Sequence, residues 1–215
     1  MIACGAIAMH VKEIAARRGF AVTVKPLPPL LHNRPERIAA AVEIAAREAL
    51  RSYDAVAVGY GDCGTNGALD EVCERLGIAR LEGSHCYDIF AGMSRMEQLM
   101  TEEPGTYVLT DYLVRSFHRS VIVELGLDRY PELRDDYFRH YSRAVWLAQA
   151  PSPELYEAAR AAANAIGLGL TVELVGDEGL ERAIEGLLAA VGRSPAGTPA
   201  SSTAVPGEVV ANQPA

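Results

Sequence analysis

Three cysteines offer the chemistry most worth following in this sequence. Cys4, Cys63 and Cys86 each come after a short apolar stretch, and each is flanked by glycine or polar residues. Cysteine thiolates bind zinc and iron–sulfur clusters, and imidazole is a second preferred zinc ligand. His32 lies in the loop after the second expected strand, and His85 stands next to Cys86. These residue types predict a metal site with Cys4, Cys63 and Cys86 as ligands, and with His32 or His85 completing or supporting it.

A glycine-rich loop, Tyr60-Gly61-Asp62-Cys63-Gly64-Thr65, surrounds the second cysteine. Glycines allow close backbone approach, and N–H groups at a strand-to-helix turn favour an anion or a thiolate. We therefore expect Tyr60, Gly61, Gly64 and Thr65 to contact a bound cofactor. Two alternatives stay open: the loop is a tight turn without a ligand, or it activates Cys63 as a nucleophile.

Acid–base groups also follow the expected strands. Asp62, Asp111 and His85 could transfer protons or orient a ligand histidine, so they are the catalytic candidates. Cys73 differs, because it lies inside an amphipathic helical pattern and is expected to pack in the core.

Strands and helices alternate along nearly the whole chain, which predicts an α/β fold. We expect one mostly parallel sheet of about six to seven strands with helices on both faces, a Rossmann-like three-layer sandwich. The carboxyl ends of such strands share one edge, where the cysteines would converge. The expected strands cover residues 2–4, 20–24, 55–59, 78–81, 106–109, 144–148 and 170–175, and longer helices are expected over 89–100 and 131–142.

Composition narrows the possible partners and location. The chain has 215 residues, 49% of them hydrophobic, and a net charge of −8. One domain over residues 1–192 is expected, followed by a disordered Pro-, Ala- and Ser-rich tail over 193–215.

Scattered Lys and Arg residues argue against nucleic acid and anionic membranes as partners. The start lacks a signal-peptide pattern, so we expect a cytoplasmic protein with reduced thiols.

The chain resembles the domain of unknown function 1638 family of bacterial and archaeal proteins over about residues 2–175. The matching segments are Ala3-Cys4-Gly5, Leu31-His32-Asn33-Arg34-Pro35-Glu36, Tyr60-Gly61-Asp62-Cys63-Gly64, Gly83-Ser84-His85-Cys86-Tyr87, Leu109-Thr110-Asp111, Leu125-Gly126-Leu127-Asp128, Leu133-Arg134-Asp135 and Tyr137-Phe138. The resemblance implies a shared fold and pocket. Some relatives stand near corrinoid-dependent methyltransferase systems, which implies one-carbon chemistry. The short first strand and the segment after Arg193 depart from the family pattern.

These observations lead to one functional hypothesis and two rivals. The first is a metalloenzyme or accessory protein of one-carbon or methyl-transfer metabolism; as an enzyme it would be a zinc- or iron–sulfur-dependent transferase or lyase. Zinc is narrowly preferred because histidines stand nearby. Its partner would be a small-molecule substrate or a protein of a methyltransferase system. The rivals are a non-catalytic carrier of a metal or corrinoid, and a metal-free enzyme with Cys63 as nucleophile.

Overall fold

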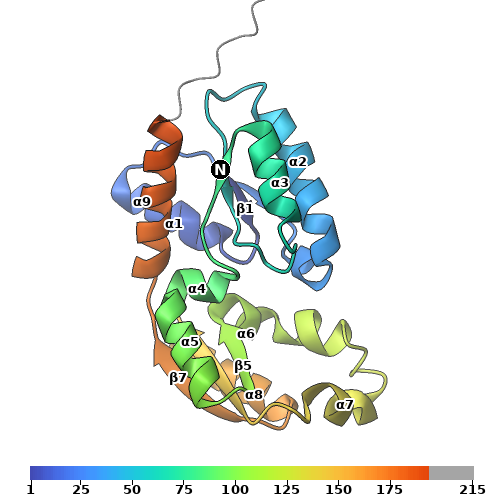
Figure 1. Cartoon of the computed structure of the whole chain (residues 1–215). Coiled ribbons are helices and arrows are strands. Elements are labelled where there is room, and N and C mark those ends of the chain that lie inside the picture. Colours follow the sequence, from blue (N-terminus) through green and yellow to red (C-terminus); the bar gives the residue numbers. More distant parts are fainter. Residues whose placement is uncertain (194–215) are drawn as a thin grey trace, which may run out of the picture.

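The computed structural model describes residues 1–193, and its strands form two parallel sheets (Figure 1). The first sheet has the order β2-β1-β3-β4 and the second the order β5-β6-β7. The α/β class and the parallel pairing are confirmed, but the expectation of one sheet of six to seven strands is wrong. The strands are β1 Ile2–Cys4, β2 Lys25–Leu27, β3 Ala57–Gly59, β4 Ala79–Arg80, β5 Thr106–Thr110, β6 Arg143–Ala148 and β7 Gly169–Leu174.

The chain divides into two sheets at its shortest strand. β4 is two residues long, and both of its residues pair with β3. It therefore offers little backbone on its other side for a further strand. The chain then runs through α4 (Cys86–Ala91) and α5 (Met93–Glu102) before β5 begins the second sheet. Strand–helix alternation predicts parallel neighbours but does not indicate where a sheet ends.

The first lobe consists of residues 1–91 together with α9 (Glu178–Arg193). On one face of its sheet lie α1 (Ala8–Arg18) and α9, and on the other lie α2 (Ile38–Ala49) and α3 (Ala68–Leu76) (Figure 1). Leu180 and Ile184 of α9 share a buried core with residues of α1 and β3. The last described helix thus completes the core of a lobe that begins at the other end of the chain.

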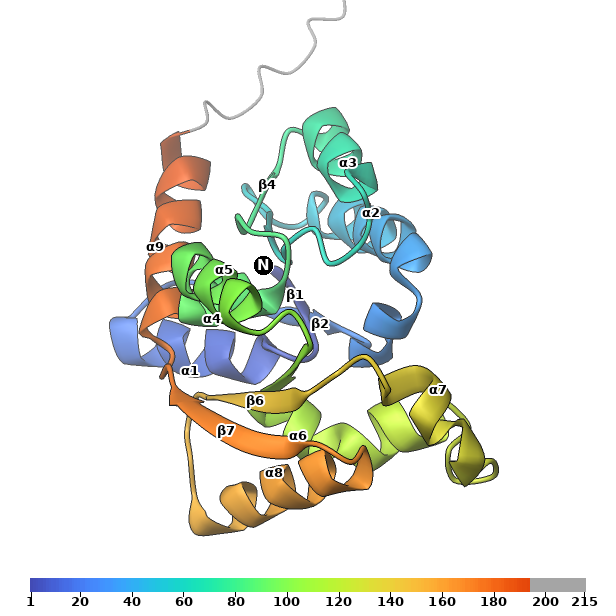
Figure 2. The ribbon, with the colours of Figure 1, turned by 60° about the horizontal axis from the view of Figure 1, so that its bottom comes forward.

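The second lobe spans residues 92–177 and is also covered on both faces. Figure 2 shows α5 on one side of its sheet and α6 (Asp111–Phe117) with α8 (Pro153–Ala165) on the other. In β6, Val145 and Leu147 join the α5 cluster, whereas Trp146 joins the α6–α8 cluster. This alternation follows from the two-residue repeat of a strand. The remaining turns of helix are η1 Pro29–Asn33, η2 Pro35–Arg37, the π-helix η3 His118–Val123, η4 Pro131–Leu133 and α7 Arg134–Phe138.

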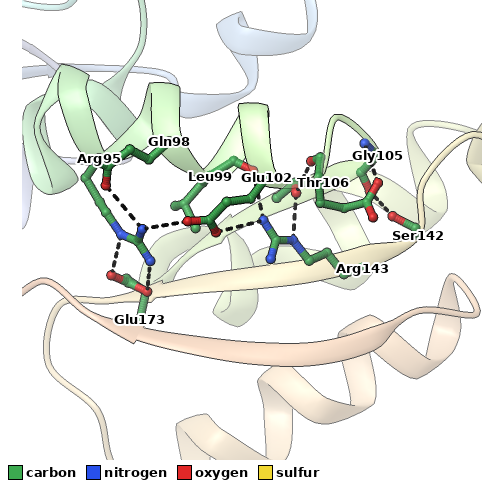
Figure 3. A network of polar contacts seen from close by, with 10 residues as sticks. Arg95, Gln98, Leu99, Glu102, Gly105, Thr106, Ser142, Arg143 and Glu173 are labelled. Carbon is green, nitrogen blue, oxygen red and sulfur yellow. Dashed lines mark hydrogen bonds and ion pairs between the residues drawn. The ribbon is translucent and has the colours of Figure 1, made fainter.

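A polar network fixes α5 to the edge of the second sheet (Figure 3). Arg95 donates two hydrogen bonds to the carboxylate of Glu173 on β7, at 2.8 and 3.0 Å. Glu102 lies 3.5 Å from Arg95 and 3.9 Å from Arg143 of β6. Arg143 also donates to the Thr106 hydroxyl at 2.8 Å. The network joins one helix to all three strands, so α5 and the sheet are held as one unit.

Three local expectations need correction. The second strand is Lys25–Leu27 and not residues 20–24, because β1 begins at Ile2 and pairs with Lys25. The helix expected over 89–100 is broken at Gly92, which has φ +83°. The helix expected over 131–142 is reduced to one turn of 3-10 helix followed by α7. The expected tail lies outside the described residues, apart from Arg193, the last residue of α9.

Asp111 ties the end of β5 to the end of β6. It is completely buried, and its carboxylate accepts hydrogen bonds from Trp146 Nε1 at 2.9 Å, Gln149 N at 3.1 Å and Ala150 N at 2.8 Å. Its own N–H donates to Gln149 Oε1 at 2.8 Å. Both carboxylate oxygens of this expected catalytic residue are therefore engaged with the fold.

We predict that Asp111→Ala lowers the free energy of unfolding by about 3 kcal/mol, because it leaves three donors without their acceptor. Urea denaturation measures the change. Asp128→Ala removes an exposed carboxylate and serves as the matched control, with an expected change within about 0.5 kcal/mol. Equal losses in the two variants would contradict a structural role for Asp111.

Candidate functional site

Three cysteines meet at the carboxyl ends of neighbouring strands of the first sheet. Cys4 is the last residue of β1, Cys63 lies in the loop after β3, and Cys86 begins α4 after β4. Since β1 pairs with β3 and β3 with β4, these ends are adjacent. All three side chains are buried, at 2%, 7% and 9% exposure, and share one core cluster. The strand ends that carry the three cysteines are therefore neighbours in the first sheet.

Burial raises the pKa of each of the three thiols. Burial raises the pKa of Cys4 to about 11, against opposing contacts with the backbone N–H groups of Ala6 and Ile7. Burial, and then the neighbouring Cys4, raises the pKa of Cys63 to about 12. Burial and then both other cysteines raise the pKa of Cys86 well above its ordinary value. At neutral pH the three groups are protonated thiols.

Two loops joined by backbone hydrogen bonds place Cys63 beside Cys86. Asp62 N donates to Gly83 O at 3.0 Å, and Cys63 N donates to Ser84 O at 2.7 Å. A Cβ atom on Gly61 would lie 2.9 Å from Gly83 O, so a larger residue would push the loops apart. The backbone of Cys63 has φ +52°, in the left-handed region that residues other than Gly, Asn and Asp seldom adopt. The loop contacts thus hold Cys63 in a conformation it would rarely choose alone.

Asp62 and Thr65 shape this loop from within. The carboxylate of Asp62 accepts from the Thr65 hydroxyl at 2.6 Å, from Gly67 N at 3.0 Å and from Asn66 N at 3.2 Å. Burial acts to raise the pKa of Asp62, but these hydrogen bonds outweigh it and the pKa is lowered. Gly64 turns the chain with φ +82°. The hydrogen bonds of the Asp62 and Thr65 side chains lie within this loop and the start of α3, whereas the sequence predicts that both residues serve a ligand.

The two candidate histidines differ in position. His32 lies in η1, directly after β2, with Nδ1 3.6 Å from Cys4 Sγ. Burial lowers the pKa of His32, which favours the neutral imidazole that a metal requires. Its ring stacks on Tyr60 at 6.1 Å between centroids. His85 is exposed and stacks on Tyr87 at 5.6 Å. His32 is therefore the histidine in contact with the thiols.

A cavity of about 290 Å³ opens over the thiols between the two lobes. The lobes are bridged here by a hydrogen bond from Asn33 Nδ2 to Ser120 O at 3.3 Å. The lining contains no Asp, Glu, Lys or Arg, so it carries no fixed charge. From the first lobe it includes His32, Asn33, Cys63, His85, Cys86 and Tyr87, and from the second Tyr107, Thr110, Tyr112, Leu113, Ser120 and Val121.

The second-lobe wall of this cavity was not foreseen. No sequence signal links these second-lobe residues to the cysteines of the first lobe. The residues are Tyr107, Tyr112 and Ser120, and their place in the cavity wall depends on how the two lobes face each other. Thr110 alone stood at an expected strand end. A larger cavity of about 580 Å³ lies at the opposite, amino end of the first sheet, against residues such as Val24 and Tyr53. It is mostly apolar and contains no cysteine or histidine, so size does not identify the reactive site.

Neither a preformed metal site nor a membrane-spanning helix is found among residues 1–193. Between residues 1 and 193, no group of three or more His, Cys, Asp or Glu side chains is already arranged to hold a metal ion. None of the helices in that range combines the length and the apolar character that a membrane crossing requires. The four cysteines are free thiols, and Cys73 is buried on α3.

We predict slow alkylation in the metal-free protein at about pH 8.5, roughly 100-fold slower for Cys4 and roughly 1,000-fold slower for Cys63 than in the unfolded chain. The thiolate is the reactive form, and both pKa values are raised, to about 11 and about 12, so the reaction should accelerate only as pH rises toward those values. Iodoacetamide labelling followed by peptide mass spectrometry measures each site. Fast labelling of Cys63 near neutral pH would contradict the buried-thiol assignment.

Comparison with known proteins assigns the chain to a family without assigning an activity. A family model described as "Protein of unknown function (DUF1638)" matches residues 26–184, well over half of the 215-residue chain. That range contains His32, Cys63 and Cys86, while Cys4 precedes it. No curated protein and no solved structure matches the chain. By the extent of this match, the chain belongs to the DUF1638 family.

Proposed function

We propose that the protein binds a thiophilic metal through Cys4, Cys63 and Cys86 and uses it on a small molecule held between the lobes. The observation that carries this proposal is the meeting of three buried thiols, each from a different strand end, beside a cavity of about 290 Å³. Soft thiolate donors select zinc or iron–sulfur clusters. A reducing compartment such as the cytoplasm would keep these thiols available.

The environment of the thiols favours a metal over a free nucleophile. A nucleophilic cysteine needs a lowered pKa, usually from a nearby cation or a helix N-terminus. Here burial raises the pKa of Cys4 to about 11, burial and the neighbouring Cys4 raise the pKa of Cys63 to about 12, and no Lys or Arg lines the cavity. A metal cation supplies the missing positive charge and displaces the thiol protons. The cluster of neutral thiols is therefore better suited to a cation than to direct attack on a substrate.

Coordination would require the ligand side chains to move. Since no ready-made ligand group exists among residues 1–193, the thiols must rotate toward a common centre as they lose their protons. His32 is the natural fourth donor for zinc, because its Nδ1 lies 3.6 Å from Cys4 Sγ. The nearby imidazole of His32 favours zinc over an iron–sulfur cluster. If three cysteines held an iron–sulfur cluster, one iron would be left for a substrate.

The cavity supports a small substrate. Its volume of about 290 Å³ is at the lower end of the usual range for small-molecule sites. A substrate could contact the metal on one side and the second-lobe residues Tyr107, Tyr112 and Ser120 on the other. One-carbon or methyl transfer, which the family resemblance implies, matches a substrate of this size. Zinc held by the three cysteines alone, with His32 displaced, would keep one open position and could activate a thiol or a water molecule there.

We predict about one zinc per chain in protein purified without oxygen, with loss of that zinc in Cys4→Ala, Cys63→Ala and Cys86→Ala. Elemental analysis measures the content, and a visible absorption spectrum distinguishes zinc from a coloured iron–sulfur cluster. Cys73→Ala is the matched control, since Cys73 is equally buried but lies on α3. Metal-free protein with four intact thiols, or equal metal loss in the Cys73 variant, would refute the proposal.

A further inference from the structure

The cavity between the lobes is lined by aromatic rings from both of them. Tyr107 and Tyr112 line it from the second lobe, and His32, His85 and Tyr87 line it from the first. Three of the nine tyrosines of the chain therefore lie at this one cavity. The larger cavity at the other end of the first sheet has a single aromatic side chain in its lining. The rings are thus concentrated where the lobes meet, and cavity size does not explain them.

Contacts with other rings hold this aromatic wall in place. His85 and Tyr87 stack with their planes 10° apart and their centroids 5.6 Å apart. Tyr107 meets Phe138 and Tyr141 nearly edge-on, at centroid distances of 5.5 and 5.2 Å. Side chains that are already fixed lose little freedom when a ligand binds. The wall is therefore prepared to receive a ligand.

The chemistry of this wall suits a cation that needs no hydrogen bonds. The face of an aromatic ring is negative and attracts a cation that lies within about 6 Å of the ring centre. A primary ammonium group would need acceptors for three N–H bonds, and an anion would be held best by Lys or Arg. The lining contains neither carboxylates nor basic side chains. A quaternary ammonium group carries its positive charge without any N–H donor, and aromatic cages are a recurring receptor for it.

The charges of the rest of the chain also allow a cation to enter. The net charge of −8 raises the concentration of cations near the protein. Arg119 opposes this effect, because its Nη2 lies 3.5 Å from the hydroxyl oxygen of Tyr112. Arg119 is exposed, so solvent and salt screen its charge. Its contact is with the polar end of Tyr112 and not with the ring.

We propose that the cavity binds a small quaternary ammonium compound, with Tyr107 and Tyr112 of the second lobe and Tyr87 of the first around its cationic head. This inference deepens the proposed function, since it names the class of the small molecule. It rests on the part of that function that places a small molecule between the lobes, and it does not depend on the metal. The volume of about 290 Å³ restricts the site to a compact head group with a short chain.

The first test compares choline with its neutral carbon isostere, in which a tert-butyl group replaces the trimethylammonium head. Calorimetric titration of the full-length protein, as purified and at low salt, measures both affinities. We expect choline to bind at least about 10-fold more tightly than the isostere, because the ring faces attract only the cation. This comparison uses the parent protein, so it does not depend on the folding of a variant.

Variants of Tyr112 then locate the bound cation. Tyr112→Leu removes the ring and should weaken choline binding about 10-fold, whereas Tyr112→Phe keeps the ring and should stay within about 3-fold of the parent. Tyr137→Leu is the matched control, since it removes an exposed ring of α7 that is not part of the lining, and it should leave the affinity unchanged. The Tm of each variant shows that it is folded.

The outcomes separate this inference from the proposed metal site. Equal affinities for choline and its isostere would show a merely apolar cavity and would overturn the inference, as would the absence of choline binding. Equal weakening in Tyr112→Leu and Tyr137→Leu would overturn the location of the cation. Metal content is measured separately, so none of these results decides it. Metal-free protein that still prefers choline to the isostere would refute the metal site and support the cation site.

Discussion

The parallel pairing of β1, β3 and β4 is the constraint on which the site depends. Paired strands lie about 4.8 Å apart, so three consecutive strand ends bring their following residues within reach of one another. The register Ala3 opposite Gly59 and Val58 opposite Arg80 places these ends at one level. Backbone hydrogen bonds between the loops after β3 and β4 then complete the approach of Cys63 to Cys86. Side chains separated by tens of residues become neighbours because of the backbone, before any attraction between them matters.

The fold accepts unfavourable features at this point and nowhere comparable in the described chain. Three thiols are buried together, one of them in a left-handed conformation, and a phenol hydroxyl is buried without a partner. Elsewhere buried polar groups are carefully satisfied, as the three donors to Asp111 show. Such local costs persist only when the surrounding packing determines the conformation. These features lie together beside a cavity, which distinguishes the carboxyl end of the first sheet from an ordinary hydrophobic core. A bound cation would relieve the crowding of the three thiols.

The sequence allowed the neighbouring strand ends that carry the cysteines to be predicted, but not the second-lobe wall of the cavity that faces them. Cys4, Cys63 and Cys86 could be placed together because strand–helix alternation implies parallel strands with a shared edge. The division into two sheets could not be foreseen, since it depends on β4 being only two residues long. Residues such as Tyr112 and Ser120 were missed for the same reason. The contacts of Asp62 and Asp111 were also hidden, because an aspartate after a strand has the same appearance whether it faces a ligand or, like Asp111, distant backbone N–H groups.

The return of α9 to the first lobe has a consequence for biosynthesis. Leu180, Ile184 and Leu187 complete the core behind the cysteines, yet they are nearly the last described residues to be made. While the ribosome is still adding the second lobe, one face of the first sheet is covered by α1 but not yet by α9. Contacts between such distant segments form slowly and leave apolar surface exposed meanwhile. A nascent chain of this design can complete the core behind the cysteines only once α9 has left the exit tunnel.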